Sequence, residues 1–224
     1  MLFRSRVTQY VYYVMKTIAM SSERPETYGG YHLVVLETEE VNAYAAPGGF
    51  IFLTKGLLRQ VENEDELAGV LAHEVVHVVK RHGIQAIEDS RWKDAWGSLV
   101  VAGAKGAARY TGAELNKVTD LFEKCLEDVV GTILEKGYDP DAEREADRMA
   151  VEYCVKAGYS PQGLLDILRR TVGHDEGKQF KTHPGGKERI SNVENALPRR
   201  SMMIDPARTS RFLSIKASDR KSVV

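Results

Sequence analysis

The residues best suited to chemistry form the pattern H-E-x-x-H at His73, Glu74 and His77. Residues four apart on a helix are separated by about 400° of rotation, so both imidazoles project from one face toward a single metal ion. The glutamate beside the first histidine stands where a carboxylate can take a proton from a metal-bound water. The pattern is therefore typical of metal-assisted hydrolysis.

The sequence on both sides of this pattern predicts a buried helix. Residues 63–66 are polar or acidic, as at a helix N-terminus, and the cations of residues 80–82 followed by Gly83 suit a C-terminal end. The part between them is apolar nearly all round, which indicates burial. Buried histidines need partners, because unpaired buried polar groups are costly. The alternative to a metal site is a pair of core histidines satisfied by hydrogen bonds.

A catalytic zinc site needs a third ligand from the protein. One known arrangement supplies a histidine six residues after the second, where this chain has Gly83. His82 is a poor substitute, because it lies nine residues after His73 and about half a turn away on the helix. The other known arrangement takes a glutamate from a later helix.

A later segment fits that role. Ala146, Ala150 and Cys154 define an apolar face at helical spacing, and Glu143 and Asp147 fall on the same face. We interpret Glu143 as the third zinc ligand and Asp147 as an acceptor that orients a ligand imidazole. The alternative is a salt-bridged structural helix with arginines of this segment as partners. The opposite face carries Glu145, Arg148, Glu152 and Lys156.

Four blocks of the chain form a recognisable set, at residues 42–58, 73–77, 143–147 and 182–190. In this order they resemble the zinc metalloendopeptidases related to the membrane peptidase HtpX and the CAAX prenyl endopeptidase, a branch of the gluzincins. The third block matches the family's E-x-x-x-D element, and the fourth matches its H-P…R-I element. The resemblance implies one Zn²⁺ per chain on His73, His77 and Glu143, with Glu74 as general base.

The resemblance also implies roles around the metal. His183 is expected near it, either stabilising the oxyanion or capping zinc as a fourth ligand, and Arg189 is expected to hold the site by a charge contact. The strand of Asn42, Ala43 and Tyr44 is expected to border the cleft and meet an extended peptide substrate. The alternatives are a solvent-exposed loop histidine, a surface charge and a turn-forming asparagine, respectively.

Composition narrows the class of protein. The 224 residues are 43% hydrophobic, enough for one domain with a sizeable core, and the net charge of −1 gives no reason to expect nucleic acid. No stretch approaches the ~20 apolar residues of a membrane-spanning helix, so the match is to soluble or peripheral members of the family. Cys125 and Cys154 are expected to be buried free thiols, and a single disulfide is the alternative.

The elements that must position these residues predict an α+β, zincin-like fold, mostly helical, with a small antiparallel sheet over the active-site helix. Residues 1–198 are expected to form a single metallopeptidase domain, and residues 199–224 a weakly patterned tail in which 210–215 could add a strand. The expected first helix covers residues 6–20, everything after residue 54 reads as helix or loop, and the strands are expected at 32–37, 41–45 and 49–53.

These observations and the resemblance together predict a zinc endopeptidase that hydrolyses peptide bonds in unfolded or misfolded proteins, with polypeptides as its partners. The alternative is a zinc-binding chaperone or assembly factor whose proteolytic activity is latent because His183 caps the metal. A structural helical domain without metal is the third reading. The resemblance favours the periplasm or a peripheral association with the cell envelope, with the cytoplasm as the alternative.

Overall fold

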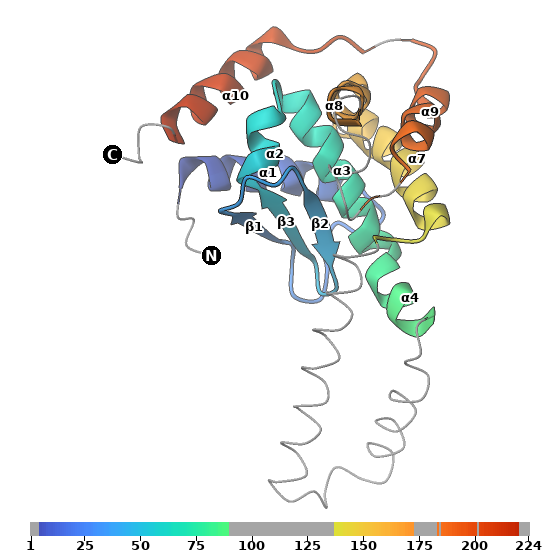
Figure 1. Ribbon diagram of the computed structural model, residues 1–224. Coiled ribbons are helices and arrows are strands. Elements are labelled where there is room, and N and C mark those ends of the chain that lie inside the picture. The colour runs from blue at the N-terminus through green and yellow to red at the C-terminus, as the bar shows by residue number, and fades with distance from the viewer. Residues whose placement is uncertain (1–4, 90–136, 173–182, 184, 201, 220–224) are drawn as a thin grey trace, which may run out of the picture.

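The computed structural model describes residues 5–89, 137–172, 183, 185–200 and 202–219. Within these ranges the chain is mostly helical and has one three-stranded sheet. The expected α+β, zincin-like fold is confirmed. Figure 1 shows helix α3 (Glu64–Lys80) in the middle, with the sheet on one side and α7 (Pro140–Lys156), α8 (Gln162–Val172) and α9 (Gly186–Ala196) on the other.

Helix α3 is fixed at both ends by its own sequence. The Asn63 side chain caps its start by accepting a hydrogen bond from the Glu66 backbone N–H, and acidic residues fill the first turn. It ends at Arg81, which adopts a left-handed conformation with φ of 60°. The expected stop at Gly83 is therefore two residues late. Nearly the whole helix is buried, as its apolar circumference predicts.

Two glycines let α8 approach α3 at the level of the main chain. A Cβ atom added to Gly69 would lie 2.7–2.8 Å from the Cα and Cβ of Leu164, closer than real side chains come. A Cβ on Gly163 would meet the backbone of Asp65 at the start of α3. Helices α3 and α8 are thus in direct backbone contact.

The sheet contains β1 (His32–Leu36), β2 (Ala43–Ala46) and β3 (Phe50–Thr54) in the order β1-β3-β2. The expectation of an antiparallel sheet is wrong in one respect, because β1 pairs with β3 in parallel and only β2 pairs with β3 antiparallel. The tight turn at Gly48 and Gly49, both at positive φ, returns β3 beside β2 and leaves β1 on its far side. Among the described strands β2 is consequently an edge, and it packs against α3.

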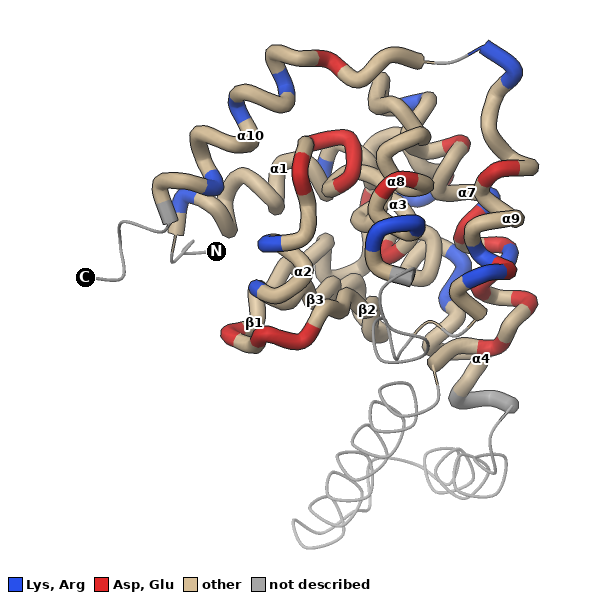
Figure 2. Tube along the Cα trace, turned by 45° about the horizontal axis from the view of Figure 1, so that its top comes forward, with Lys and Arg blue, Asp and Glu red and all other residues tan. Residues whose placement is uncertain are grey.

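The other helices of the described residues are α1 (Arg6–Met20), α2 (Lys55–Gln60), α4 (His82–Asp89) and α10 (Pro206–Asp219). The bounds of α1 are those expected. A strand at residues 210–215 is wrong, because this stretch belongs to α10, which packs on α1 and buries Phe212. Figure 2 shows basic residues recurring along α10, and one of them, Arg211, reaches Glu64 at the start of α3.

Two further expectations concern thiols and membranes. Cys154 is a buried free thiol, and burial raises its pKa, which leaves it unreactive. Cys125 lies outside the described residues.

Among the helices that the structure describes, none combines the length and the apolar character needed to cross a bilayer.

Candidate metal centre

The H-E-x-x-H helix and α7 meet at the predicted ligands. His73 and His77 project from α3 with their Nε2 atoms 3.0 Å apart. Glu143 reaches them from the first turn of α7, which Asp139 caps and Pro140 begins. Its Oε2 lies 3.3 Å from His73 Nε2, and its Oε1 lies 3.5 Å from His77 Nε2. The structure therefore brings together the three residues expected to bind zinc.

His183 completes this group and is buried, not exposed on a loop. Its Nδ1 lies 2.8 Å from Glu143 Oε1 and 3.2 Å from His73 Nε2. One nitrogen or oxygen from each of the four side chains lies within 4.8 Å of all the others. The tightly grouped ligand set is thus His73, His77, Glu143 and His183.

These donors fit a metal ion of the zinc type. Ligands about 2.1 Å from the centre of a tetrahedron are separated by about 3.4 Å, close to the observed contacts between His73, His77 and Glu143. Within the described chain, Glu143 Oε2 is buried and makes no well-aligned hydrogen bond. An unpaired buried carboxylate oxygen is costly, and a cation would satisfy it.

Glu74 faces the same centre without belonging to the ligand set. Its Oε1 lies 3.2 Å from His183 Nε2. Its Oε2 is buried and has no hydrogen-bond partner among the described residues. One carboxylate oxygen is therefore held beside the metal site with its lone pairs unused, which suits an acceptor of a proton.

Asp147 and Arg189 hold His73 from behind. Asp147 Oδ1 lies 3.0 Å from His73 Nδ1, where it could accept the proton of this nitrogen and leave the Nε2 lone pair for a metal, and Arg189 Nη2 lies 3.2 Å from the same nitrogen. Arg189, on α9, donates from Nη2 to the same carboxylate oxygen at 2.8 Å. Its Nε also lies 3.6 Å from Glu143 Oε2. Both residues are buried, so Arg189 is not a surface charge.

Burial and neighbouring charges set the protonation states. Burial holds the pKa of His77 well below its usual value, which keeps this imidazole in the neutral form that binds metals. Burial alone would raise the pKa of Glu143, but His183 and His73 hold it well below its usual range. For His183, burial alone would lower the pKa, but the carboxylates of Glu143 and Glu74 raise it to about 10. A protonated His183 thus balances the carboxylates around it.

Sequence reasoning missed the residues behind His77. His82 Nδ1 lies 2.9 Å from His77 Nδ1, and His82 Nε2 lies 3.1 Å from Glu145 Oε2. His82 was considered only as a ligand, and Glu145 only as part of the solvent-facing side of α7. The left-handed turn at Arg81 begins α4 at His82 and directs this side chain back toward α3. The cations of residues 80–82 before Gly83 indicated that a helix ends here, but not that His82 points back toward His77.

Of Asn42, Ala43 and Tyr44, the residues expected to meet a substrate, Ala43 contacts the metal centre through its main chain. The Ala43 carbonyl lies 3.0 Å from His183 Nε2. The Asn42 main chain pairs instead with Thr54, whose N–H donates to the Asn42 carbonyl at 3.1 Å. The Tyr44 ring stacks on Phe52 of β3, with ring centroids 4.8 Å apart. Only Ala43 among the three therefore directs a main-chain acceptor toward the metal centre.

Tyr138 is a second residue that the sequence did not reveal. Its hydroxyl donates to the Ala45 carbonyl at 3.0 Å, and its ring stacks on His77 with centroids 4.0 Å apart. Burial raises the pKa of this phenol, so it stays protonated and remains a donor. The carbonyls of Ala43 and Ala45 both point away from β3, and each is held by a side chain of the centre.

Known proteins resemble this chain along most of its length. It is similar to the beta-barrel assembly-enhancing protease of Escherichia coli K12 (28% identity over 74% of this chain and 34% of that protein). It is similar to the metalloprotease YcaL of the same organism (27%, over 73% and 61%). It is also similar to the mitochondrial metalloendopeptidase OMA1 of Schizosaccharomyces pombe (29%, over 85% and 53%). The chain thus spans between about a third and three fifths of the length of these relatives.

The expected class of enzyme, a metalloendopeptidase, agrees with the names of these relatives. The narrower expectation of the HtpX and CAAX prenyl endopeptidase branch stays a prediction. Residues 5–197 match the peptidase family M48, and this range contains every side chain of the metal centre. The chain belongs to peptidase family M48.

Proposed function

We propose that this protein is a zinc-dependent endopeptidase that hydrolyses peptide bonds in unfolded or misfolded polypeptides. The observation that carries the proposal is the convergence of His73, His77 and Glu143, with the Glu74 carboxylate held beside them. Residue spacing within each helix does not by itself predict that the Glu143 carboxylate of α7 lies beside the histidines of α3. The family assignment supports the same chemistry.

His73, His77 and Glu143 would hold the metal. Bound zinc supplies a Lewis acid that polarises the scissile carbonyl and lowers the pKa of water toward neutrality. Asp147 keeps the proton of His73 on Nδ1, and Arg189 keeps Asp147 ionised and in place. These contacts leave the imidazole nitrogens that face the centre free of protons.

Glu74 would move the proton of the reaction. Its carboxylate takes a proton from the attacking water as the tetrahedral carbon forms, and then gives it to the amine that leaves. The unpaired Oε2 of Glu74 is available for this transfer. His183, protonated at neutral pH, lies where it could stabilise the negative charge that develops on the carbonyl oxygen.

Strand β2 would hold the substrate. An extended peptide can add to a free sheet edge through main-chain hydrogen bonds, which require no particular side chains and so suit unfolded chains. The outward carbonyls of Ala43 and Ala45 would accept from such a peptide. Each already accepts from a side chain, His183 or Tyr138, so a substrate that pairs here must displace both.

That occupied edge supports a second candidate function, a zinc-binding chaperone or assembly factor with latent activity. After loss of a proton, His183 would add a fourth ligand to the set, and four protein ligands are typical of closed structural zinc sites, whereas catalytic sites keep one position open. For location we infer the periplasm or the cell envelope, as a peripheral protein, with the cytoplasm as the alternative. The relatives named for β-barrel assembly support this inference.

The test combines metal analysis with cleavage of an unfolded protein such as casein. The parent protein should hold about one zinc per chain and lose cleavage with a chelator, regaining it when zinc is added back. Glu74→Gln should keep the zinc and lose about 10²–10⁴-fold in rate, as expected when a general base is removed. Cleavage at the parent rate by a zinc-loaded Glu74→Gln variant would refute the assignment.

A further inference from the structure

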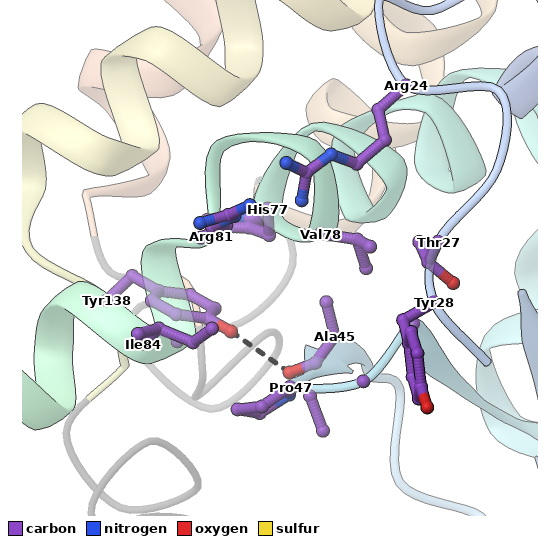
Figure 3. A pocket seen from close by; sticks show the side chains of 14 residues that line it. Arg24, Thr27, Tyr28, Ala45, Pro47, His77, Val78, Arg81, Ile84 and Tyr138 are labelled. Atoms are coloured by element: carbon purple, nitrogen blue, oxygen red, sulfur yellow. Dashed lines mark hydrogen bonds between the residues drawn. The ribbon is translucent and has the colours of Figure 1, made fainter. Parts of the chain in front are cut away.

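A cavity lies beside the metal centre, at the end of β2 that is farther from His183. Its volume is about 220 Å³. Figure 3 shows it between the C-terminal end of α3 and the hairpin that contains Pro47, with Tyr138 at one side. A cavity of about 150 Å³ can hold a benzene molecule, so this one has room for a single amino-acid side chain.

Two guanidinium groups line this cavity. Arg24 comes from the loop between α1 and β1, and Arg81 follows the last turn of α3. Figure 3 shows both side chains on the opposite side of the cavity from Ala45 and Pro47. Among the described residues that line the cavity, none is an aspartate or a glutamate. The cavity is therefore positively charged.

Neither guanidinium is neutralised within the part of the chain that the structure describes. No carboxylate there lies within salt-bridge distance of Arg24 or Arg81. Arginines elsewhere in the described chain, such as Arg170 and Arg211, are paired with glutamates. Two unpaired cations beside one cavity favour a ligand with negative charge.

The backbone of Arg81 supports a role for its side chain. It is the single non-glycine residue with positive φ among the described residues. A left-handed conformation is unfavourable for an ordinary residue, and glycine usually takes this position after a helix. Glycine would turn the chain toward His82 equally well and without that cost. Strained residues of this kind cluster at functional sites, which points to a function for the arginine side chain.

The cavity also lies on the path of a substrate that pairs with β2. Ala43 is beside the metal centre, and Ala45 and Ala46 border the cavity two or three residues along the strand, about 7–10 Å away. A peptide antiparallel to β2 runs from the cavity toward the metal. Its side chain about two or three residues before the cleaved bond would then enter the cavity.

We propose that this cavity is a specificity subsite for an acidic side chain, aspartate or glutamate, on the amino-terminal side of the cleaved bond. The inference rests on the proposed endopeptidase function and names the substrate class. Arg24 and Arg81 bind the carboxylate, and their planar donor groups match the two oxygens of a carboxylate. The enzyme therefore recognises the main chain of the substrate along β2 and the negative charge of one substrate side chain in the cavity.

The test uses quenched fluorescent peptides that are identical except for Glu, Gln or Lys at each position before the cleaved bond. The parent protein should cleave the best Glu peptide about 10-fold or more faster, in kcat/KM, than its Gln counterpart, because hydrogen bonds to charged groups exceed neutral ones. The Lys peptide should be poorest. A Glu-to-Gln ratio near one at every position would overturn the proposal.

The variants assign the preference to these arginines. Arg24→Gln and Arg81→Asn should each lower the Glu-to-Gln ratio, and the double variant should bring it to about one. Asparagine is chosen because it tolerates the left-handed conformation. The matched control is Arg148→Gln, on the exposed side of α7, which should leave the ratio unchanged. A double variant that keeps the parent ratio would refute the assignment.

A binding measurement separates this proposal from the proposed function. Labelled Glu and Gln peptides are titrated into zinc-loaded Glu74→Gln protein, and fluorescence anisotropy reports their affinity without cleavage. Tighter binding of the Glu peptide, lost in a variant that also carries both arginine changes, supports the subsite even for a protein that cleaves nothing. Equal affinities would refute the subsite while leaving the parent's hydrolysis intact.

Discussion

His77 and His82 face each other through their Nδ1 atoms, 2.9 Å apart, so one of these two nitrogens must donate and the other accept. When His77 offers the Nε2 lone pair to a metal, its Nδ1 carries the proton and donates to His82. His82 then carries its own proton on Nε2 and donates to Glu145, 3.1 Å away. The chain of contacts therefore selects the tautomer of His77 that binds metal.

Replacing His82 should weaken metal binding. His82→Ala leaves the buried Nδ1 proton of His77 without an acceptor, and loss of such a contact typically costs about 10–100-fold in metal affinity. Competition with a chromogenic chelator measures the affinity, and unfolding of the chelated protein reports any separate loss of stability. His82→Gln, which keeps an acceptor at this position, should restore part of the affinity. An affinity of His82→Ala within twofold of the parent would contradict this role.

Replacing His183 should release the edge strand. His183→Ala removes the group that occupies the Ala43 carbonyl and the fourth position of the ligand set. If His183 acts as a cap on the metal, zinc should remain bound and kcat/KM on casein peptides should rise several-fold, mainly through a lower KM. A rate lower by about 10²-fold or more would instead assign His183 to oxyanion stabilisation. Inactivity of both parent and variant would favour the chaperone function.

Removing Arg189 should destabilise the fold. Arg189→Met leaves the buried Asp147 carboxylate without its cation, and breaking a buried ion pair costs about 3–5 kcal/mol. Denaturant unfolding in the presence of a chelator measures this loss without a contribution from metal. The double variant with Asp147→Asn should recover part of the stability, because the unpaired charge is gone. Additive losses in the two single variants would indicate that the pair does not act as a unit.

Truncation tests the predicted division of the chain at residue 198. Helix α10 buries Phe212 and pairs Arg211 with the buried Glu64 at 2.7 Å. Removing residues 199–224 should lower Tm by about 5 °C or more, since burial of one aromatic side chain alone is worth about 2 kcal/mol. Arg211→Ala should account for a minor share, because this side chain is half exposed. An unchanged Tm would show that the tail is independent of the domain.

Because Tyr10 donates a hydrogen bond to the same Glu64, we expect the stability of the fold to change at high pH. Burial and the hydrogen bond to Glu64 raise the pKa of Tyr10 to about 12, above its ordinary value of 10.0. Its contribution to stability is therefore complete below pH 10 and is lost as the pH rises through about 12. Tyr10→Phe should flatten the fall in unfolding free energy over this range. Spectroscopic titration of tyrosinate provides an independent reading of the same group.

Helical periodicity predicted which candidate ligands share a face, because it links side chains that are several residues apart in sequence. It placed His73 and His77 together on one helix and Glu143 with Asp147 on another, and these two faces meet in the fold. It also gave the bounds of α1. A fixed rotation per residue makes such inferences possible without knowledge of the tertiary structure.

Contacts that depend on chain reversal were beyond this reasoning. Alternating apolar residues indicate a strand but carry no information on its direction, so the parallel pairing of β1 with β3 was missed. His82 reaches His77 only through the left-handed turn at Arg81, a conformation that sequence predicts for glycine and seldom for arginine. Tyr138 meets Ala45 across 93 positions of sequence, a distance that no local pattern spans.

The backbone contact between α3 and α8, which Gly69 of α3 and Gly163 of α8 allow, bears on how this enzyme could be redesigned. Where two backbones touch, no side chain lies between them that could be enlarged or trimmed to move one helix against the other. The distance between α3 and α8 therefore cannot be changed in small steps by replacing side chains. New substrate preferences would have to arise at the opposite end of α3, where a hairpin and a loop meet it through exchangeable side chains.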